Sequence, residues 1–421
     1  MMKLQRSTIT FLVGAVIFYG VVQVLISIGV LSQFWNTILR LGAVMAIVSI
    51  GLNLIYGFNG QFSLGQWGFY AIGAYAAADV TYRWTQLKSA GGLAVLLLGV
   101  LFAGLAILLV MKLVARLRGL DPLSAFALYQ VGTVSVVIVA VQIGKALDAP
   151  LSAILGALPM NVSTMIVYLI AVVLAGIMAA EVSFLFGLPV LTLGSDYFGI
   201  ATLGLTIIVK VLLDNSDTLL GFAEMKGARG MIGIPKVTSW LVVFIALVLV
   251  IILVKNLLVS SYGRAIVSVR EDEIAATAMG INVANYKILT FVIGSFLAGL
   301  AGGLYAHING FLHPDTFNFI KSFDPLIIVV FGGLGSITGT VFASFAWALV
   351  LEGLLRLVLP QGFETWRFVV YPLLLLIMML LKPNGLVGNF EIPFLRDQVY
   401  SMRSKLLKKS SKESQSQEAA Q

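Results

Sequence analysis

The stretch Ser260–Lys287, SSYGRAIVSVREDEIAATAMGINVANYK, is the one long charged interruption in a chain whose flanking segments are apolar. Arg270 and the acidic run from Glu271 to Glu273 fall close together in it, and a small-residue run ending at Gly280 follows. Charged side chains are costly in hydrocarbon, so this stretch must lie outside the lipid, between two apolar spans. Its composition and position predict a loop that contacts another protein.

The middle of this stretch predicts a short helix from Asp272 to Gly280. Asp272 is a good capping residue, the acids beside it complement the positive end of the helix dipole, and Gly280 favours a stop. At helical spacing four apolar side chains share one face: Ile274, Ala275, Ala278 and Met279. Such a helix, about 12 Å long, suits a groove on a partner protein. The alternative is a helix lying on lipid headgroups, which the acidic residues disfavour at an anionic leaflet.

The composition of the whole chain indicates a polytopic membrane protein. Of its 421 residues 59% are hydrophobic and 11% charged, with a mean hydropathy of +1.01, whereas soluble domains carry about 25% charged residues. The net charge of +8 does not point to nucleic acid, because Lys and Arg gather on the cytoplasmic loops of membrane proteins. With no Cys and two His, neither a disulfide framework nor a metal site is predicted.

The apolar segments predict an all-α fold of about 10–12 transmembrane helices, some of them short or broken at Gly. The candidate spans are 8–32, 35–58, 61–79, 92–117, 124–146, 163–188, 197–213, 238–258, 288–308, 325–337, 340–358 and 367–382. Three parts follow: an uncleaved N-terminal helix (1–34), a transmembrane core (35–390) and a basic, partly disordered tail (391–421). The basic cluster of the tail favours a cytoplasmic C-terminus, and an even number of spans then places both termini in the cytoplasm.

Two Gly-rich segments at membrane depth form a loose pair. They are Gly57–Gly65 (GFNGQFSLG) and Phe331–Gly339 (FGGLGSITG), and each precedes an apolar run. Broken helices are tolerated in a membrane where protein or a water-filled path satisfies the backbone, and matching interruptions in two halves indicate an inverted repeat with the transport path between the halves. The candidate path residues are Asn59, Gln61, Ser63, Gln66, Ser336 and Thr338. The alternative is tight packing through small residues, without substrate contact.

Ionisable residues inside the predicted spans are few, and no catalytic motif is present. Glu181 lies within a span, where local pairing is the favoured interpretation; Asp79, Lys210, Glu352 and Arg356 lie near span ends, where they can snorkel or pair. This scarcity disfavours a proton- or sodium-driven carrier. The sequence contains neither a phosphate-binding GxxxxGK[ST] loop nor a GxSxG or HExxH motif, so the chain is not expected to be an enzyme.

Several segments resemble the membrane subunits of ATP-binding-cassette importers for branched-chain amino acids. They are GLNLIYGFNGQFSLGQWGFYAIGAYAAA (51–78), SDYFGIATLGLTIIV (195–209), RGMIGIP (229–235), the charged loop (263–287), FVIGSFLAGLAGGLYAHINGFLHPDTF (291–317) and FGGLGSITGT (331–340). The charged loop resembles the E-A-A-x-x-x-G coupling motif of such permeases: Ala275, Ala276 and Gly280 match, and the acid is displaced to Glu273. The resemblance covers roughly 35–80 and 165–390, in the order and spacing of the longer of two permease subunits. It does not cover 90–160, where an extra helix pair is expected.

This resemblance implies a multi-pass subunit of a bacterial inner-membrane importer that works by alternating access. Its expected partners are a second homologous permease, two cytoplasmic ATPases and an extracytoplasmic solute-binding protein, which the loops 214–237 and 309–324 would face. The ATPases would bind ATP and Mg, so no cofactor is expected in this chain. The residues implied in ATPase coupling are Arg270, Glu271, Asp272, Glu273, Ala275, Ala276, Met279 and Gly280. The substrate implied is a branched-chain amino acid or a related small solute. The alternatives are an ion-coupled secondary transporter and a passive channel for a small neutral solute such as urea.

Overall fold

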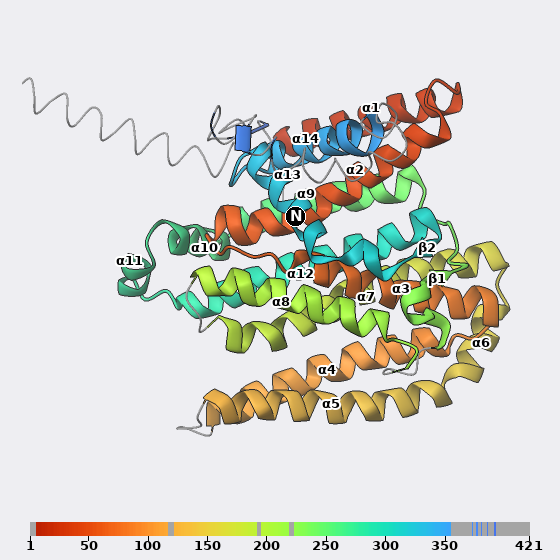
Figure 1. Ribbon diagram of the computed structural model, residues 1–421, viewed down its shortest axis with the longest axis horizontal. Helices are drawn as coiled ribbons and strands as arrows, with labels where there is room; N and C mark the ends of the chain where they lie inside the picture. Colours follow the sequence, from red (N-terminus) through yellow and green to blue (C-terminus); the bar gives the residue numbers. More distant parts are fainter. Residues whose placement is uncertain are drawn as a thin grey trace, which may run out of the picture.

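The computed structural model describes residues 6–116, 122–191, 195–218 and 223–354, together with seven single positions between 373 and 392. These residues form a bundle of long helices (Figure 1). Nine helices in the described ranges are long and apolar enough to cross a membrane. The predicted all-α polytopic membrane fold is therefore confirmed.

The elements follow one another along the chain with a single pair of short strands. The α-helices are α1 (Arg6–Ser27), α2 (Gln33–Leu52), α3 (Gln66–Leu87), α4 (Gly91–Arg116), α5 (Pro122–Ala146), α6 (Asp148–Gly156), α7 (Met160–Val190), α8 (Ser195–Asp214), α9 (Trp240–Val259), α10 (Ser261–Glu271), α11 (Glu273–Ala278), α12 (Val283–Asn309), α13 (Phe323–Gly332) and α14 (Ile337–Trp347). The π-helical segments are η1 (Asn53–Phe58) and η6 (Ala348–Leu354), and the 3₁₀ turns are η2 (Ala223–Met225), η3 (Gly227–Arg229), η4 (Pro314–Phe317) and η5 (Phe319–Ser322). The strands are β1 (Met231–Ile232) and β2 (Phe311–Leu312).

Two of the predicted spans are wrong in extent. The segment 61–79 is not one helix, because residues 59–65 are non-helical and α3 begins at Gln66 and continues to Leu87. The segment 325–337 is not a span, because α13 has ten residues and reaches only about 15 Å, half the hydrocarbon thickness. The predicted span 367–382 and the tail beyond 392 fall outside the continuous described ranges.

The bundle has two distinguishable ends (Figure 1). At one end, here named the α11 end, α10 and α11 project beyond the other helices. At the opposite end, the sheet end, Met231 pairs with Leu312 and Ile232 with Phe311 in an antiparallel ladder. This ladder joins the two long connections 214–237 and 309–324. In its described residues, the connection after α8 forms the 3₁₀ turns η2 and η3 and the strand β1 before α9 begins.

The helices α2 and α12 run antiparallel through the centre of the bundle. Arg40 of α2 and His307 of α12 both bond the backbone of Thr238, whereas Gly51 lies against Gly294 further along. Each of these long helices is followed by a non-helical segment and another helix, 59–65 before α3 and the η4–η5 turns before α13. The two runs are traversed in opposite directions, which supports the inverted-repeat prediction.

The predicted extra helix pair, α4 and α5, lies along one edge of the bundle (Figure 1). It packs on α7, where the Glu181 carboxylate lies 3.0 Å from the place a Cβ on Gly104 would occupy. Only 17% of the apolar window of α5 is buried, so the pair borders lipid. The basic end of α4, with Lys112 and Arg116, lies at the α11 end.

A buried hydrogen-bond network explains one of the two histidines. His307 contacts Thr81 Oγ1 through Nε2 at 2.7 Å and Gly303 O through Nδ1 at 2.7 Å. Its ring also meets Tyr168 edge-on, and the Tyr168 hydroxyl lies 2.7 Å from Thr238 Oγ1. Both ring nitrogens are thus engaged, and His307 links three helices as a structural residue.

Candidate functional site

The helix predicted between Asp272 and Gly280 is present, and its ends are formed as expected. Asp272 Oδ1 accepts hydrogen bonds from the amides of Ile274 (2.8 Å) and Ala275 (3.0 Å). Gly280 has φ +81°, a left-handed conformation that terminates helices, and its amide bonds back to Thr277 O. The helix proper, α11, has six residues rather than about eight. A second helix, α10, precedes it directly and was not predicted.

Two large apolar side chains are exposed on α11 and at its C-terminal end. Ile274 is 84% exposed and Met279 82% exposed, which is unusual for large apolar side chains outside an interface. Ala276 is buried instead, and an ion pair of Glu273 with Lys287 (2.5 Å) holds α11 to the start of α12. Of the predicted docking residues, Met279 and Ala275 are therefore presented outward and Ala276 is turned inward.

Arg270 connects this projecting element to the membrane core. Its guanidinium Nη1 donates to Gly57 O, 213 residues away in sequence. Its side chain also lies against Gly60 and Gly335, where an added Cβ would stand 3.3 Å from Arg270 Cγ and 3.1 Å from Nη1 respectively. Arg270 thus touches both Gly-rich segments at once, a position that the sequence analysis, which grouped it with the docking residues, did not predict.

Asn53 holds the two Gly-rich segments side by side. Its side chain accepts from Gly335 N and donates to Ser336 O and Thr340 Oγ1, each at 2.9 Å. A Cβ on Gly57 would stand 1.7 Å from Asn53 Oδ1 and 2.6 Å from Gly335 N, so the Asn53 amide and the Gly335 backbone fill the space beside Gly57. The two segments, which form a loose pair in the sequence, also lie side by side in space, a contact that was not predicted. In the sequence, the feature that could have indicated Asn53 is a single amide side chain at membrane depth, four residues before Gly57.

Several predicted path residues make structural contacts instead of facing an open path. Ser336 Oγ accepts from Gly339 N at 2.9 Å and caps α14. Thr338 bonds the carboxylate of Glu391, which also accepts from Ile337 N at 2.7 Å. Burial raises the pKa of the Glu391 carboxyl, although these hydrogen bonds oppose the shift. Glu391, the first residue of the predicted tail, is thus packed against the core.

The remaining path candidates lie in the non-helical segment 59–65 and at Gln66, the first residue of α3. Asn59 Nδ2 donates to Gln61 Oε1 at 3.0 Å, and Ser63 Oγ accepts from Gly65 N at 3.3 Å. Gln66 is 1% exposed, and neither amide atom has a hydrogen-bond partner among the described residues. A buried amide without partners costs on the order of 1–3 kcal/mol, so Gln66 is the strongest candidate for contact with a passing solute.

The start of α3 is also where the two non-helical segments meet. Leu64 N donates to Thr202 Oγ1 of α8 at 3.0 Å. Trp67 Nε1 donates at 3.0 Å to Thr316 O in η4, and the Trp67 ring stacks on Tyr70. Gln66 therefore sits between the broken part of the first half and the η4 turn of the second.

Gln66→Leu and Asn53→Leu are expected to have opposite signatures. Gln66→Leu removes an amide without partners, so the thermal stability of the purified chain should stay unchanged or rise, while uptake falls about tenfold if a solute uses that amide. Asn53→Leu removes three hydrogen bonds and leaves their partners buried, so it should cost more than about 3 kcal/mol of stability. Thermal unfolding and radiolabelled uptake in vesicles measure both. Equal uptake by Gln66→Leu and the unaltered chain would remove Gln66 from the path.

A buried ion-pair cluster beside α13 was missed by the sequence analysis. Lys321 Nζ lies 3.1 Å from Asp324 Oδ2 and 3.7 Å from Glu352 Oε1, and all three side chains are at most 15% exposed. Glu352 was expected to snorkel or pair near the end of a span, and in the structure it pairs with Lys321. Lys210 likewise pairs, with Asp214 at 2.7 Å. The cluster was missed because Lys321 lies in the connection between α12 and α13. Hydropathy does not indicate that this connection packs against the helices.

Comparison with known proteins places these features in a family. The family model described as branched-chain amino acid transport system / permease component matches residues 34–150 and 149–379. The matched residues include the α4–α5 pair, which the sequence analysis had placed outside the resemblance, so that boundary was wrong.

Individual curated relatives agree with the family match. The high-affinity branched-chain amino acid transport system permease protein LivM of Escherichia coli K12 is 32% identical over 248 residues, which cover 51% of this chain and 56% of the relative. The probable LivM permease of Methanocaldococcus jannaschii is 27% identical, with coverages of 54% and 70%. The LivH permease of Salmonella typhimurium is 25% identical over 86% of this chain and 96% of its own length. The chain thus spans about half the length of the LivM permease of Escherichia coli. No solved structure matches significantly.

Proposed function

Because the chain belongs to the branched-chain amino acid transport permease family, we propose that it is the membrane subunit through which an ATP-driven importer moves branched-chain amino acids, or a related small solute, into the cytoplasm. The relatives are transport permeases by name, which disfavours the alternatives of an ion-coupled carrier and a passive channel. ATP and Mg would be bound by two separate cytoplasmic ATPase subunits, since the sequence carries no phosphate-binding motif.

One observation carries the proposal. The exposed apolar side chains Ile274 and Met279, here named the knob, lie next to Arg270, whose side chain contacts both Gly-rich segments. Ile274 and Met279 project at the α11 end, and Arg270 on the adjoining helix bonds Gly57 O beside Gly335. A groove on an ATPase subunit would take the knob. Closure of the ATPases would then move α10, and Arg270 would carry that movement to the two Gly-rich segments, where a rigid-body change between inward-open and outward-open states can occur.

The rest of the molecule fits this assignment. Lys112 and Arg116 lie at the α11 end, and basic residues gather on the cytoplasmic side, so that end would face the cytoplasm of a bacterial inner membrane. The β1–β2 ladder would then face an extracytoplasmic solute-binding protein. A second, homologous permease would complete the path beside Gln66.

The knob is tested by charge insertion. The double change Ile274→Glu and Met279→Glu places two carboxylates in the apolar contact, and desolvating them is expected to reduce ATPase co-purification at least tenfold. Ile232→Glu is the control, because Ile232 is also an exposed apolar residue (57%) but lies at the sheet end. Co-purification with the double variant equal to that of the control would contradict the docking assignment.

The energy source is tested with the purified chain alone. Reconstituted without ATPase subunits, the chain should take up no leucine under a proton or sodium gradient. Addition of the ATPases, the second permease and the binding protein should restore ATP-dependent uptake. Gradient-driven uptake by the chain alone would overturn the importer assignment in favour of a secondary transporter.

A further inference from the structure

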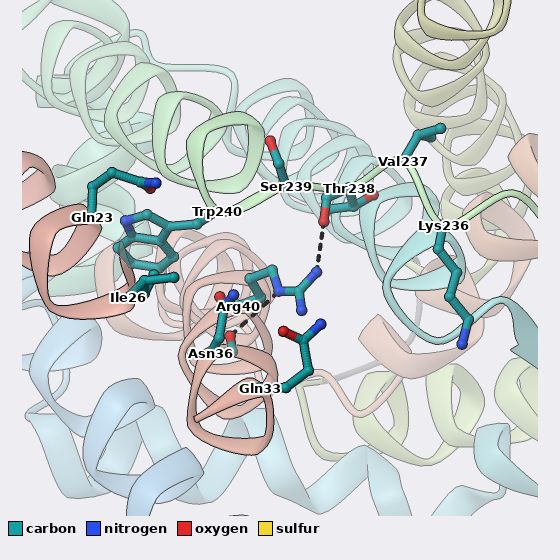
Figure 2. A pocket seen from close by; sticks show the side chains of 10 residues that line it. All are labelled: Gln23, Ile26, Gln33, Asn36, Arg40, Lys236, Val237, Thr238, Ser239 and Trp240. Atoms are coloured by element: carbon teal, nitrogen blue, oxygen red, sulfur yellow. Dashed lines mark hydrogen bonds between the residues drawn. The ribbon is translucent and has the colours of Figure 1, made fainter. Parts of the chain in front are cut away.

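At the sheet end, α1, α2 and the segment leading into α9 enclose a polar pocket away from the α3 site. It has a volume of about 290 Å³. Its lining residues are shown in Figure 2: Gln23 and Ile26 from α1, Gln33, Asn36 and Arg40 from α2, and Lys236, Val237, Thr238, Ser239 and Trp240. No acidic side chain is among them.

Two cations line this pocket without an acidic partner. The Arg40 guanidinium donates to Thr238 O (2.9 Å), Asn36 O (3.3 Å) and Thr37 Oγ1 (3.3 Å), all neutral acceptors. Within the described residues, neither Arg40 nor Lys236 takes part in a salt bridge. Figure 2 shows the guanidinium between Thr238 and the amide of Gln33, with Lys236 on the side away from Trp240. The pocket therefore carries an uncompensated positive charge.

Neutral polar groups in the same lining also lack partners. Trp240 is 3% exposed, and among the described residues its Nε1 has no hydrogen-bond acceptor and the buried Asn36 Oδ1 has no donor. Trp240 is the first residue of the twenty-residue helix α9, and no side chain caps that helix. The Trp240 indole N–H and the positive end of the α9 dipole both favour an anion, whereas Asn36 Oδ1 is an acceptor and does not add to the donor set.

The surroundings indicate that the anion belongs to a lipid. Only 6% of the apolar window of α1 is buried, so this helix borders the hydrocarbon, and Val21, Val24 and Ile28 near the pocket are each more than half exposed. The polar pocket lies at the ends of α1, α2 and α9, where headgroups would lie, and Ile26 contributes an apolar wall. A guanidinium, an ammonium group and side-chain amides in one lining form a donor set that suits a phosphate.

We propose that this pocket binds the phosphate of a membrane phospholipid, whose tails lie along α1 and whose headgroup fastens α1 to α2 and α9. Direct contacts of α1 with the bundle are limited; Phe18 and Tyr19 meet Phe244 of α9 at ring-centroid distances of 5.9 and 5.8 Å. A bound lipid adds charged and polar contacts to this weak junction.

The test compares lipid binding to the full-length chain in detergent by native mass spectrometry. Phosphatidylglycerol should bind at least tenfold more tightly than a diacylglycerol with the same tails, which lacks the phosphate. Lys236→Gln, a change at an exposed position that leaves the fold intact, should weaken phosphatidylglycerol binding about fivefold, and Arg40→Gln together with Lys236→Gln more than tenfold. Lys145→Gln, an exposed cation at the end of α5, is the matched control and should have no effect.

Three results would overturn the proposal. Equal binding of phosphatidylglycerol by the unaltered chain and the Lys236→Gln variant would remove the charge argument. Equal binding of diacylglycerol would leave only an apolar groove. Complete displacement of phosphatidylglycerol by millimolar inorganic phosphate would identify a small free anion rather than a lipid as the ligand.

Discussion

Replacing Arg270 with Gln is expected to lower ATP-driven uptake by roughly tenfold to a hundredfold while the ATPase subunits still co-purify. The change removes the guanidinium that bonds Gly57 O and lies against Gly335. A hydrogen bond to a charged donor contributes about 1.5–3 kcal/mol, and each 1.4 kcal/mol corresponds to about a factor of ten. The knob on α11 is untouched, so docking should persist and ATP hydrolysis should become uncoupled from transport.

Arg264 provides the matched control for this experiment. It lies on the same helix, α10, but it is exposed, and its guanidinium bonds Val259 O (3.0 Å) and Ser261 Oγ (3.2 Å) near the start of that helix. Arg264→Gln should therefore leave uptake and the ratio of hydrolysis to transport unchanged, and Arg270→Lys should restore part of the uptake. Identical uptake by the Arg264→Gln and Arg270→Gln variants would show that Arg270 does not connect α10 to the Gly-rich segments.

Gly302→Ala is expected to prevent accumulation of the folded chain. The helices α3 and α12 cross with their backbones in contact, and a Cβ at Gly302 would stand 1.9 Å from Tyr70 O and 2.9 Å from Ala74 N. Neither atom belongs to a flexible side chain, so the two helices would have to separate along much of their length. Overpacking in a close-packed core costs about 1–3 kcal/mol and more where backbone must move, a large part of a typical stability of 5–15 kcal/mol.

Membrane abundance and size-exclusion profile measure this effect, with Gly99→Ala as control. Gly99 is also in a long apolar helix, α4, but an added Cβ there meets nothing within 4 Å. Abundance of the Gly99→Ala variant should equal that of the unaltered chain, since Ala favours the helix by about 1 kcal/mol over Gly. Normal abundance of the Gly302→Ala variant would mean that α3 and α12 do not pack as closely as described.

The sequence predicted those parts of the candidate site that depend on local order. Asp272 as cap, Gly280 as stop and the outward Met279 all follow from residues within one or two helical turns of each other, and the structure has each of them. The pattern also marked the two Gly-rich segments as a loose pair, but their contact in space came from the structure. Their use as a path remains a prediction; in the structure Ser336 caps α14 and Thr338 bonds Glu391.

The residues that the sequence did not indicate are those whose partners lie far away along the chain. Arg270 reads as one more charge in a charged loop, yet it reaches Gly57; Asn53 reads as an isolated amide, yet it joins Ser336, 283 residues on. Hydropathy also favoured a span over 325–337, because an average over a window does not distinguish a ten-residue helix and a turn from one continuous helix.

By itself, then, the sequence determined that the chain lies in a bilayer, because its apolar excess requires one. It also determined the local geometry: helices form where apolar runs are long, they are interrupted where Gly is frequent, and a capped short helix lies between two spans. These follow from hydrophobicity and hydrogen bonding over a few neighbouring residues. Only the tertiary structure decided that Arg270 bonds the backbone of Gly57. It also decided that the Gln66 amide has no hydrogen-bond partner among the described residues, and that Arg40 and Lys236 line one pocket in which no acidic side chain is found. Such contacts depend on how helices pack against each other, and that packing sums many weak contacts between residues far apart in sequence.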